Sequence, residues 1–385
     1  MKPSKQPNRL SVFAVTAPGL EPICAAELRA LGIRGTVEEG GVAWKGDLES
    51  VARANLWLRT ASRVLVRVAE FTAKAFFELE LHAKQIPWDR FVSTGSKVDF
   101  RVTCRKSKLY HSDAVAQRLA QALERRVSNV QLVNSSDAGD ENAAESDHQL
   151  FVVRFFRDVC TVSADTSGAL LHFRGYRQEL AKAPLRETLA AAVLLGAGWS
   201  GDTPLTDPMC GSGTIPIEGA LISRRMAPGR ARTFAFLRWP HADKKMWNAM
   251  LESARTGELP SSPVEIVGAD RDAGAIAAAR ANAERARVAD DIVFVKQSIS
   301  ALAAAETPGL VVVNPPYGVR VGDTGALKDL YAQLGNVMRK QRSGSTLAVL
   351  SADRTLERQT RLPLEERFRT KNGGIPVRLV IAPTP

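Results

Sequence analysis

The feature that most constrains the fold is a regular alternation of strand-like and helix-like segments in the second half of the chain. After about residue 180, short apolar runs alternate with longer segments of helical periodicity. The predicted strands are 204–207, 265–270, 291–296, 309–313, 346–351 and 377–382. Strands separated by helices form βαβ crossovers, so this half predicts a parallel sheet covered by helices.

The first half of the chain has a different pattern. Strand-like segments are 11–16, 41–44, 64–68, 96–102 and 150–157, and helical ones are 21–31, 48–58 and 113–127. Short strands mixed with short helices predict small α+β modules. The boundary between the two halves is expected near residues 170–184.

Composition and charge exclude several classes of protein. The chain has 385 residues with 45% hydrophobic side chains, which is a globular composition. Its longest apolar stretch, 189–198, is too short to span a membrane, and its N-terminus makes a poor signal peptide, so we expect a cytoplasmic protein. Four scattered cysteines form no CxxC pair, which supports neither a zinc site nor a disulfide framework.

The net charge of +11 favours a polyanionic partner, nucleic acid above all. Three basic clusters are candidates for contacting it, although each could equally be an ordinary solvated face. They are Arg101, Arg105, Lys106 and Lys108; Arg154, Arg157, Arg174, Arg177 and Lys182; and Arg224, Arg225, Arg230, Arg232 and Arg238 with Trp239 and Trp247 as stacking surfaces. The segment 134–149 is instead acidic, and we expect a mobile loop away from the ligand.

The first chemical motif is the run DPMCGSGTIP at residues 207–216, between a predicted strand and a predicted helix. Gly211 and Gly213 allow a ligand to approach the backbone, and the helix start favours an anionic group. The P-loop pattern is absent, and Pro216 stands where a dinucleotide fingerprint needs a small residue. Because Asp207 suits an ammonium group, the ligand that fits is S-adenosylmethionine; a plain Gly-rich turn is the alternative.

A second acid, Asp270, ends the strand predicted at 265–270. A carboxylate at this place can bind both hydroxyls of a ribose. Asp270 could also simply cap the helix that follows, and the two roles are compatible.

The second chemical motif, Asn314-Pro315-Pro316-Tyr317, follows directly after the apolar run 310–313. The amide oxygen of Asn314 and the carbonyl of Pro315 offer two acceptors for the hydrogens of an exocyclic base amine, and Tyr317 offers a ring for stacking. Such acceptors orient a weakly nucleophilic nitrogen and stabilise the charge it gains during methyl transfer. A Pro-rich turn with an incidental Asn and Tyr is the alternative.

Taken together, these motifs resemble the amino-directed class I S-adenosylmethionine-dependent methyltransferases. Segments 174–177, 183–190, 16–21, 55–63 and 86–88 narrow the resemblance to THUMP-containing RNA methyltransferases, and within them to the bacterial 23S rRNA guanine-N2 methyltransferases. The resemblance implies a Rossmann-like α/β domain with a mostly parallel seven-stranded sheet, preceded by α+β ferredoxin-like and THUMP domains. It also implies methylation of the exocyclic N2 amine of a guanine in 23S rRNA.

Domain boundaries follow from the resemblance. We expect a ferredoxin-like domain at 9–66, a THUMP RNA-binding domain at 67–170, a linker at 171–183 and the methyltransferase domain at 184–385. The expected partner is rRNA, with no membrane, no obligate protein partner and a monomeric state. No fused second methyltransferase is expected, because the chain stops at residue 385.

The resemblance also implies the site residues. Those for the target guanine are Asn314, Pro315 and Tyr317; those for the cofactor are Asp207, Gly211, Gly213, Thr214, Asp270, Arg271, Ser298, Arg186 and Thr188; no metal ligand is expected. Relatives often carry an Asp after the third strand near the adenine, where this chain has Gln297 and Ser298. Three other functions stay open: a tRNA guanine-N2 methyltransferase, a non-catalytic ribosome-assembly factor, and, least favoured, a nicotinamide oxidoreductase.

Overall fold

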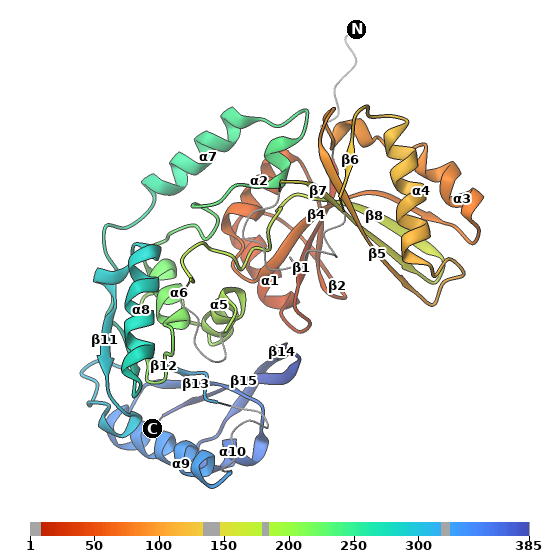
Figure 1. The fold of residues 1–385 in the computed structure, drawn as a ribbon. Helices are drawn as coiled ribbons and strands as arrows, with labels where there is room; N and C mark the ends of the chain where they lie inside the picture. The colour runs from red at the N-terminus through yellow and green to blue at the C-terminus, as the bar shows by residue number, and fades with distance from the viewer. Residues whose placement is uncertain (1–8, 134–146, 179–184, 317–323, 385) are drawn as a thin grey trace. The chain divides into compact units, whose positions relative to one another are not determined.

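The structure is a computed structural model that describes residues 9–133, 147–178, 185–316 and 324–384 (Figure 1). The chain divides into two compact units. Unit 1 comprises Met1–Val15, Ala25–Leu171 and Ala231–Glu252, and unit 2 comprises Thr16–Cys24, His172–Arg230 and Ser253–Pro385. The segment 231–252, although it lies within the second half of the sequence, therefore belongs to the unit built mainly from the first half.

The described residues of unit 1 contain one eight-stranded sheet in the order β2-β3-β1-β4-β8-β7-β5-β6. Its strands are β1 Leu10–Thr16, β2 Thr36–Glu38, β3 Gly41–Gly46, β4 Ala61–Thr72, β5 Lys97–Arg105, β6 Gln131–Leu132, β7 Gln149–Phe156 and β8 Val159–Asp165. The long strand β4 joins the β1–β3 group to β8, and β5 pairs parallel with β7 while β7 and β8 form an antiparallel hairpin.

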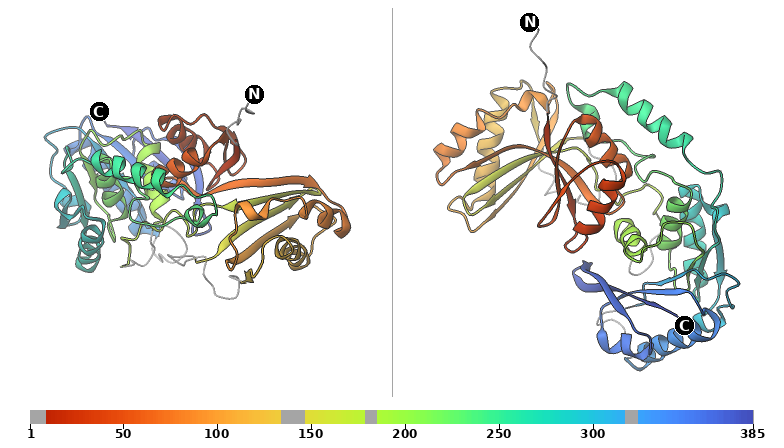
Figure 2. Two further views of the ribbon diagram at one scale, coloured as in Figure 1. Left: turned by 90° about the horizontal axis from the view of Figure 1, so that it is seen from above. Right: turned by 180° about the vertical axis from the view of Figure 1, so that it is seen from behind.

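The helices between these strands are α1 Glu21–Ala30, α2 Leu48–Trp57, α3 Phe76–Ala83 and α4 Ser112–Glu124. Helix α2 contacts β3 and β4, and α4 contacts β5. Asp47 begins α2 as an N-cap, because its carboxylate accepts a hydrogen bond from the Ser50 amide at 2.8 Å. Helices α3 and α4 contact each other and lie together against one face of the sheet (Figure 2). On that face Trp88, which follows α3, packs edge-on against Phe100 and Phe151.

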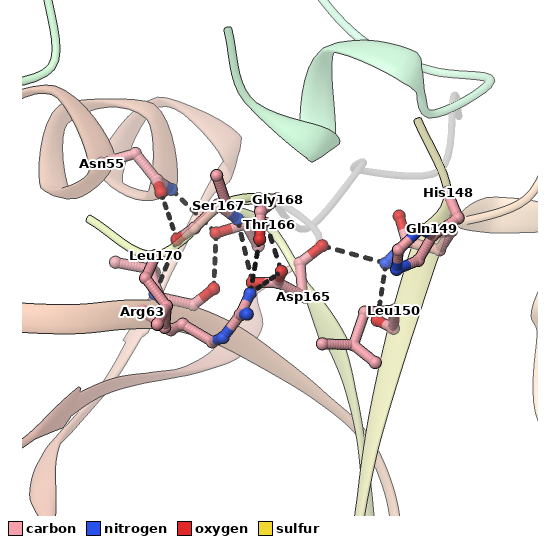
Figure 3. Close-up of polar contacts among 12 residues, drawn as sticks. Asn55, Arg63, His148, Gln149, Leu150, Asp165, Thr166, Ser167, Gly168 and Leu170 are labelled. Carbon is pink, nitrogen blue, oxygen red and sulfur yellow. Dashed lines mark hydrogen bonds and ion pairs between the residues drawn. The ribbon is translucent and has the colours of Figure 1, made fainter. Parts of the chain in front are cut away.

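A buried polar network lies at the end of β8 (Figure 3). The Asp165 carboxylate, fully buried, pairs with the Arg63 guanidinium at 2.5 Å and accepts the backbone amides of Ser167 and Gly168. The Ser167 hydroxyl donates to the Asn55 amide oxygen of α2 at 2.7 Å. Because a buried charge is tolerated only when it is paired and hydrogen-bonded, this network fixes α2, β4 and β8 to one another.

The described residues of unit 2 contain a seven-stranded sheet in the order β11-β10-β9-β12-β13-β15-β14. Its strands are β9 Leu205–Asp207, β10 Ile266–Asp270, β11 Val293–Lys296, β12 Leu310–Val313, β13 Thr346–Ser351, β14 Glu365–Asn372 and β15 Ile375–Pro383. The first five are mutually parallel, and β15 runs antiparallel to both β13 and β14. The predicted mostly parallel seven-stranded sheet is confirmed.

Helices cover both faces of this sheet. Leu310 and Val312 of β12 pack in a core with α5 Glu187–Gly196, α6 Thr214–Ser223 and α8 Ala273–Ala286. Val311 and Val313 pack in a second core with α9 Thr324–Gln341 and α10 Arg354–Gln359. Alternate side chains of a strand point to opposite faces, which explains why a strand buried on both sides is an unbroken apolar run. None of the helices that the structure describes has the length and apolarity that a bilayer crossing requires.

All six strands predicted in the second half are present, but β14 was missed. Its side chains are mostly exposed and charged, since it pairs with β15 alone at the edge of the sheet. A polar edge strand lacks the apolar alternation on which the prediction depends.

The expectation that the Arg-rich segment after α6 presents stacking tryptophans is wrong. Trp239 and Trp247 are buried, and Trp239 packs edge-on against Phe91. Three of the arginines hold the fold together: Arg224 pairs with Asp291 at 2.9 Å, Arg230 with Glu258 at 3.2 Å, and Arg232 donates to backbone carbonyls. The acidic segment 134–149 lies outside the described residues except at 147–149.

Candidate active site

Three strands of unit 2 end side by side at the carboxyl edge of its sheet. Strand β9 lies between β10 and β12, and all three are parallel. The topology therefore brings Asp207, Asp270 and Asn314, which stand at or just after these strand ends, to one edge. This is the edge at which open α/β sheets bind their ligands.

The Gly-rich loop between β9 and α6 is fixed at one glycine and open at the other. Gly213 has φ +82°, and a Cβ there would lie 2.9 Å from the Cβ of Ala279 on α8. Gly211 has φ +52°, and a Cβ there would meet no heavy atom within 4 Å. Only glycine adopts such backbone angles without strain, so the loop packs tightly against α8 while leaving space beside Gly211.

Asp207 is a buried carboxyl group at the base of this loop, with 1% of its surface exposed. Its Oδ1 accepts a hydrogen bond from the Met209 amide at 3.1 Å. Burial, together with repulsion from Asp270, raises the pKa of Asp207 to about 8. A cationic ligand group beside it would favour its ionised form.

Asp270 ties two turns together through both of its carboxylate oxygens. Oδ2 accepts the Gly211 amide and Oδ1 accepts the Asp272 amide, each at 3.0 Å. The residue that caps α8 is Asp272, whose side chain accepts the Gly274 amide at 2.8 Å. The capping role considered for Asp270 therefore belongs to Asp272, and Asp270 instead holds the Gly-rich loop.

Asn314 presents an unused acceptor just beyond β12. Its Oδ1 is buried and has no hydrogen-bond partner among the described residues. Pro315 is buried as well and can donate no hydrogen bond, while Tyr317 lies outside the described residues. Leaving a buried acceptor unsatisfied costs about 1–3 kcal/mol, so such an atom at a ligand-binding edge points to a ligand that donates a hydrogen bond.

The start of α5 supplies two further predicted residues, the N-cap Arg186 and Thr188 in the first turn. Arg186 is exposed, and its carbonyl accepts the amides of Leu189 and Ala190 at the start of the helix. Thr188 is buried. Between them the buried Glu187 pairs with Arg177 at 3.0 Å, and burial raises the pKa of Glu187 to about 7.

Sequence reasoning missed a buried polar group beside this segment. The Tyr176 hydroxyl donates to Glu218 Oε1 at 3.0 Å, and Arg174 lies 3.5 Å from the same oxygen. Arg174 and Arg177 were expected at an RNA-facing cluster, and that expectation is wrong, because both are committed to buried or half-buried ion pairs. An acid within the otherwise apolar helix α6 was the signal that could have revealed the group.

The remaining predicted residues lie around the same edge. Thr214 is buried at the first position of α6, and Arg271 is exposed immediately after β10. Ser298 is exposed, and its hydroxyl lies 2.8 Å from that of Ser300. The neighbouring Gln297 amide donates to the Asp270 carbonyl at 3.0 Å, which holds this turn beside β10. Across the four described ranges, no cluster of His, Cys, Asp or Glu could hold a metal ion.

Comparison with protein families gives two matches. A family model described as "RMKL-like, methyltransferase domain" matches residues 174–381, which is more than half of the chain. A second, described as "RlmL ferredoxin-like domain", matches residues 11–65. The first match covers β9, β10 and β12 with all the predicted site residues.

Similar proteins extend over nearly the whole chain. A Synechocystis protein with the provisional name of an RNA methyltransferase is 36% identical over 96% of this chain and 95% of its own length. The ribosomal RNA large subunit methyltransferase K/L of Syntrophotalea carbinolica is also 36% identical, over 96% of this chain and 53% of its own length. The chain thus spans about half of that relative.

A solved structure has the same fold throughout. It is that of SMU.472, provisionally described as a methyltransferase and crystallised with SAH. It covers 98% of each chain with a TM-score of 0.87 and 29% identity. SAH is what S-adenosylmethionine becomes after it has given up its methyl group.

Proposed function

Because the chain belongs to the RMKL-like methyltransferase family, we propose that it methylates the exocyclic N2 amine of a guanine in 23S rRNA. Its fold is that of a Rossmann-like methyltransferase, and its cofactor is S-adenosylmethionine. The rRNA substrate is supported by the K/L relative and by the net charge of +11. The observation that carries the chemistry is the buried, unpartnered Oδ1 of Asn314.

The residues present fit the cofactor. The space beside Gly211 lets a ligand lie against the backbone, and the buried carboxyl of Asp207 suits the ammonium of the methionine part. Asp270, at the end of the next strand, is placed for the ribose hydroxyls. The full proposed cofactor set is Asp207, Gly211, Gly213, Thr214, Arg186 and Thr188 around the methionine part, Asp270 at the ribose, and Arg271 and Ser298 toward the adenine.

The target amine is proposed to bind at Asn314 and Pro315. Bound S-adenosylmethionine supplies a methyl group already activated on a sulfonium, so no strong general base is needed. Asn314 Oδ1 and the Pro315 carbonyl accept the two hydrogens of the amine and aim its nitrogen at that methyl group. The same acceptors stabilise the positive charge that develops on nitrogen, and Tyr317 stacks on the flipped base.

The domain organisation is proposed from the same family relation. It consists of a ferredoxin-like domain at 9–66, a THUMP RNA-binding domain at 67–170, a linker at 171–183 and the catalytic domain at 184–385. The match at residues 11–65 supports the first of these. We further propose a monomer that needs no protein partner, which size-exclusion chromatography of the purified chain tests.

Substitution of Asn314 by Ala tests the proposed function. We expect single-turnover methylation of 23S rRNA to fall at least about a hundredfold, as when one preorganised polar contact to developing charge is removed. Calorimetry should give a dissociation constant for S-adenosylmethionine within about threefold of wild type, because Asn314 is assigned to the base and not to the cofactor.

A matched control is Asn336→Ala, since Asn336 is exposed on α9. It should leave both methylation and cofactor binding unchanged. If Asn314→Ala loses cofactor affinity and methylation in equal measure, the assigned role of Asn314 is wrong. If wild type binds no S-adenosylmethionine, a non-catalytic assembly factor becomes the better account.

A further inference from the structure

The sheet of unit 1 has one face covered by helices and an opposite face that carries exposed side chains. Phe71 of β4 stacks on His82 of α3, and Phe100 and Phe151 contact Trp88. These residues point toward α3 and α4. Because successive side chains of a strand point to opposite faces, the residues that alternate with them point away from the helices.

Strand register aligns those alternate residues in rows across β5, β7 and β8. Arg105, Phe156 and Val159 are partners in one row, and Thr103, Arg154 and Thr161 are partners in the next. The residue types in the two rows are unusual for a solvated sheet face, since an aromatic ring lies among arginines. We call these two rows, with the adjoining turn residue Arg157 and loop residues Lys106 and Lys108, the open face.

Phe156 is the only aromatic side chain in the open face, and 36% of its surface is exposed. The guanidinium of Arg154 lies 5.5 Å from the centre of its ring, and that of Arg157 lies 5.2 Å from it. Two cations therefore flank a ring that the fold has not buried. An exposed ring close to two guanidiniums offers a base a stacking partner beside positive charge.

The cations of the open face have no acidic partners among the described residues. No ion pair is found there for Arg105, Lys106, Lys108, Arg154 or Arg157. The nearest acid in sequence is Asp158, in the turn between β7 and β8. Its carboxylate accepts a hydrogen bond from the Lys108 amide at 2.7 Å and so connects this turn to the loop after β5. Glu70, level with Arg154 and Thr161, accepts a hydrogen bond from the Thr161 hydroxyl.

The two ends of this face differ in exposure. Asp99 and Ser163, which point to the same face at one end of the strands, are buried. Arg105, Arg154 and the turn residue Arg157, at the far end, are exposed.

We propose that the open face binds unpaired nucleotides of the RNA substrate, with a base stacked on Phe156 and phosphates held by the flanking cations. This proposal rests on the proposed function only in taking RNA as the substrate. An exposed ring beside cations favours single-stranded RNA. The bases of a duplex stack on one another and offer no free face to a ring, whereas the phosphates of a duplex can be bound by cations without any ring. The open face disfavours a protein partner, because a surface with this excess of positive charge would repel most protein surfaces that lack a matching acidic patch.

The test measures binding of the full chain to a fluorescein-labelled oligo(A) RNA of about 12 nucleotides, a length that one single-strand site can cover. We expect Phe156→Ala to raise the dissociation constant roughly tenfold and Phe156→Trp to keep it near wild type. Arg154→Glu should weaken binding by a similar factor and make log affinity fall less steeply with log salt concentration, since a phosphate contact is lost.

Matched controls lie on the helix-covered side of the same sheet. Phe77, on α3, is 71% exposed, and Arg125 is exposed at the end of α4. Phe77→Ala and Arg125→Glu therefore make the same side-chain changes away from the open face. Both should bind RNA like wild type, and calorimetry should give all variants the wild-type affinity for S-adenosylmethionine.

The outcomes separate this proposal from the proposed function. Oligo(A) affinities within twofold of wild type for both Phe156→Ala and Arg154→Glu would overturn it, even if 23S rRNA is methylated normally. Unchanged oligo(A) affinities are the result expected if the open face binds a ribosomal protein instead of RNA. Loss of RNA binding in these variants would support it whether or not the methylated base is a guanine.

Discussion

At the scale of single residues, the site depends on polar atoms that burial has separated from water. Asn314 Oδ1 has no described partner, and Asp207 is a carboxyl group whose pKa burial raises to about 8. Each would be unfavourable in a protein that bound nothing, because a buried polar group needs a partner. Each becomes favourable when a ligand supplies one, a donor for Asn314 and a cation for Asp207.

The raised pKa of Asp207 predicts that cofactor affinity rises with pH. In the free protein the carboxyl binds a proton below about pH 8, and that proton must leave before the carboxylate can hold an ammonium group. Between pH 6 and pH 7.5, below the range in which an α-amino group loses its own proton, affinity should increase on the order of tenfold. Calorimetry in two buffers of different ionisation enthalpy should detect proton release.

Two variants test whether the proton released on cofactor binding comes from Asp207 or from Glu187. Asp207→Asn should bind the cofactor more weakly and without this dependence on pH. Glu187, whose pKa burial raises to about 7, is a second acid that titrates in this range. Glu187→Gln should keep the dependence; if it removes the dependence instead, the proton belongs to Glu187. A flat profile for wild type would contradict both assignments.

At the scale of elements, the turn from β9 into α6 places the cofactor by giving its two glycines different tasks. Gly213 has to be glycine for packing, because its neighbour is the backbone and Cβ of Ala279 on α8. Gly211 has to be glycine for access, because nothing else occupies the space beside it. The amide of Gly211 is held by Asp270, so the turn and the end of β10 form one unit.

Two alanine substitutions should separate these tasks. Gly213→Ala combines a left-handed backbone angle with a close contact to α8, and should lower the free energy of unfolding by about 2–4 kcal/mol. Gly211→Ala meets no neighbour and should cost only about 1–2 kcal/mol, yet its methyl group would enter the space assigned to the cofactor. Urea unfolding and cofactor calorimetry measure the two effects; normal cofactor binding by Gly211→Ala would contradict the assigned position.

Some strands buried on both faces, such as β12, could be predicted from sequence, and several polar or exposed elements could not; β8 was missed although most of its residues are buried. The run 310–313 is apolar throughout because β12 packs in two cores, so its limits were predictable. Helix α3 was missed because Phe77 and Leu81 are exposed, which blurs its apolar face. The acid in α6 could have indicated that Glu218 is buried, but its partner Arg174 could not be predicted, because residues far apart in sequence meet only through the fold.

At the scale of the whole molecule, the fold divides the basic clusters suggested by the sequence into cations that stay exposed, such as Arg105 and Arg154, and cations that form ion pairs. Arg174, Arg177, Arg224 and Arg230 form ion pairs within unit 2 and contribute little to an RNA-binding surface. The cations without acidic partners among the described residues include those of the open face in unit 1. Positive charge in a sequence therefore favours a polyanionic partner, but the fold decides which cations are available to it.

The most direct test of the central claim is the identity of the methylated nucleoside. Deproteinised 23S rRNA from a strain lacking the gene would be incubated with the purified protein and isotopically labelled S-adenosylmethionine, then digested and analysed by mass spectrometry beside tRNA treated in the same way. We expect labelled N2-methylguanosine in the 23S rRNA with wild type, and at least about a hundredfold slower labelling with Asn314→Ala. Label in N6-methyladenosine, or in tRNA alone, would contradict it.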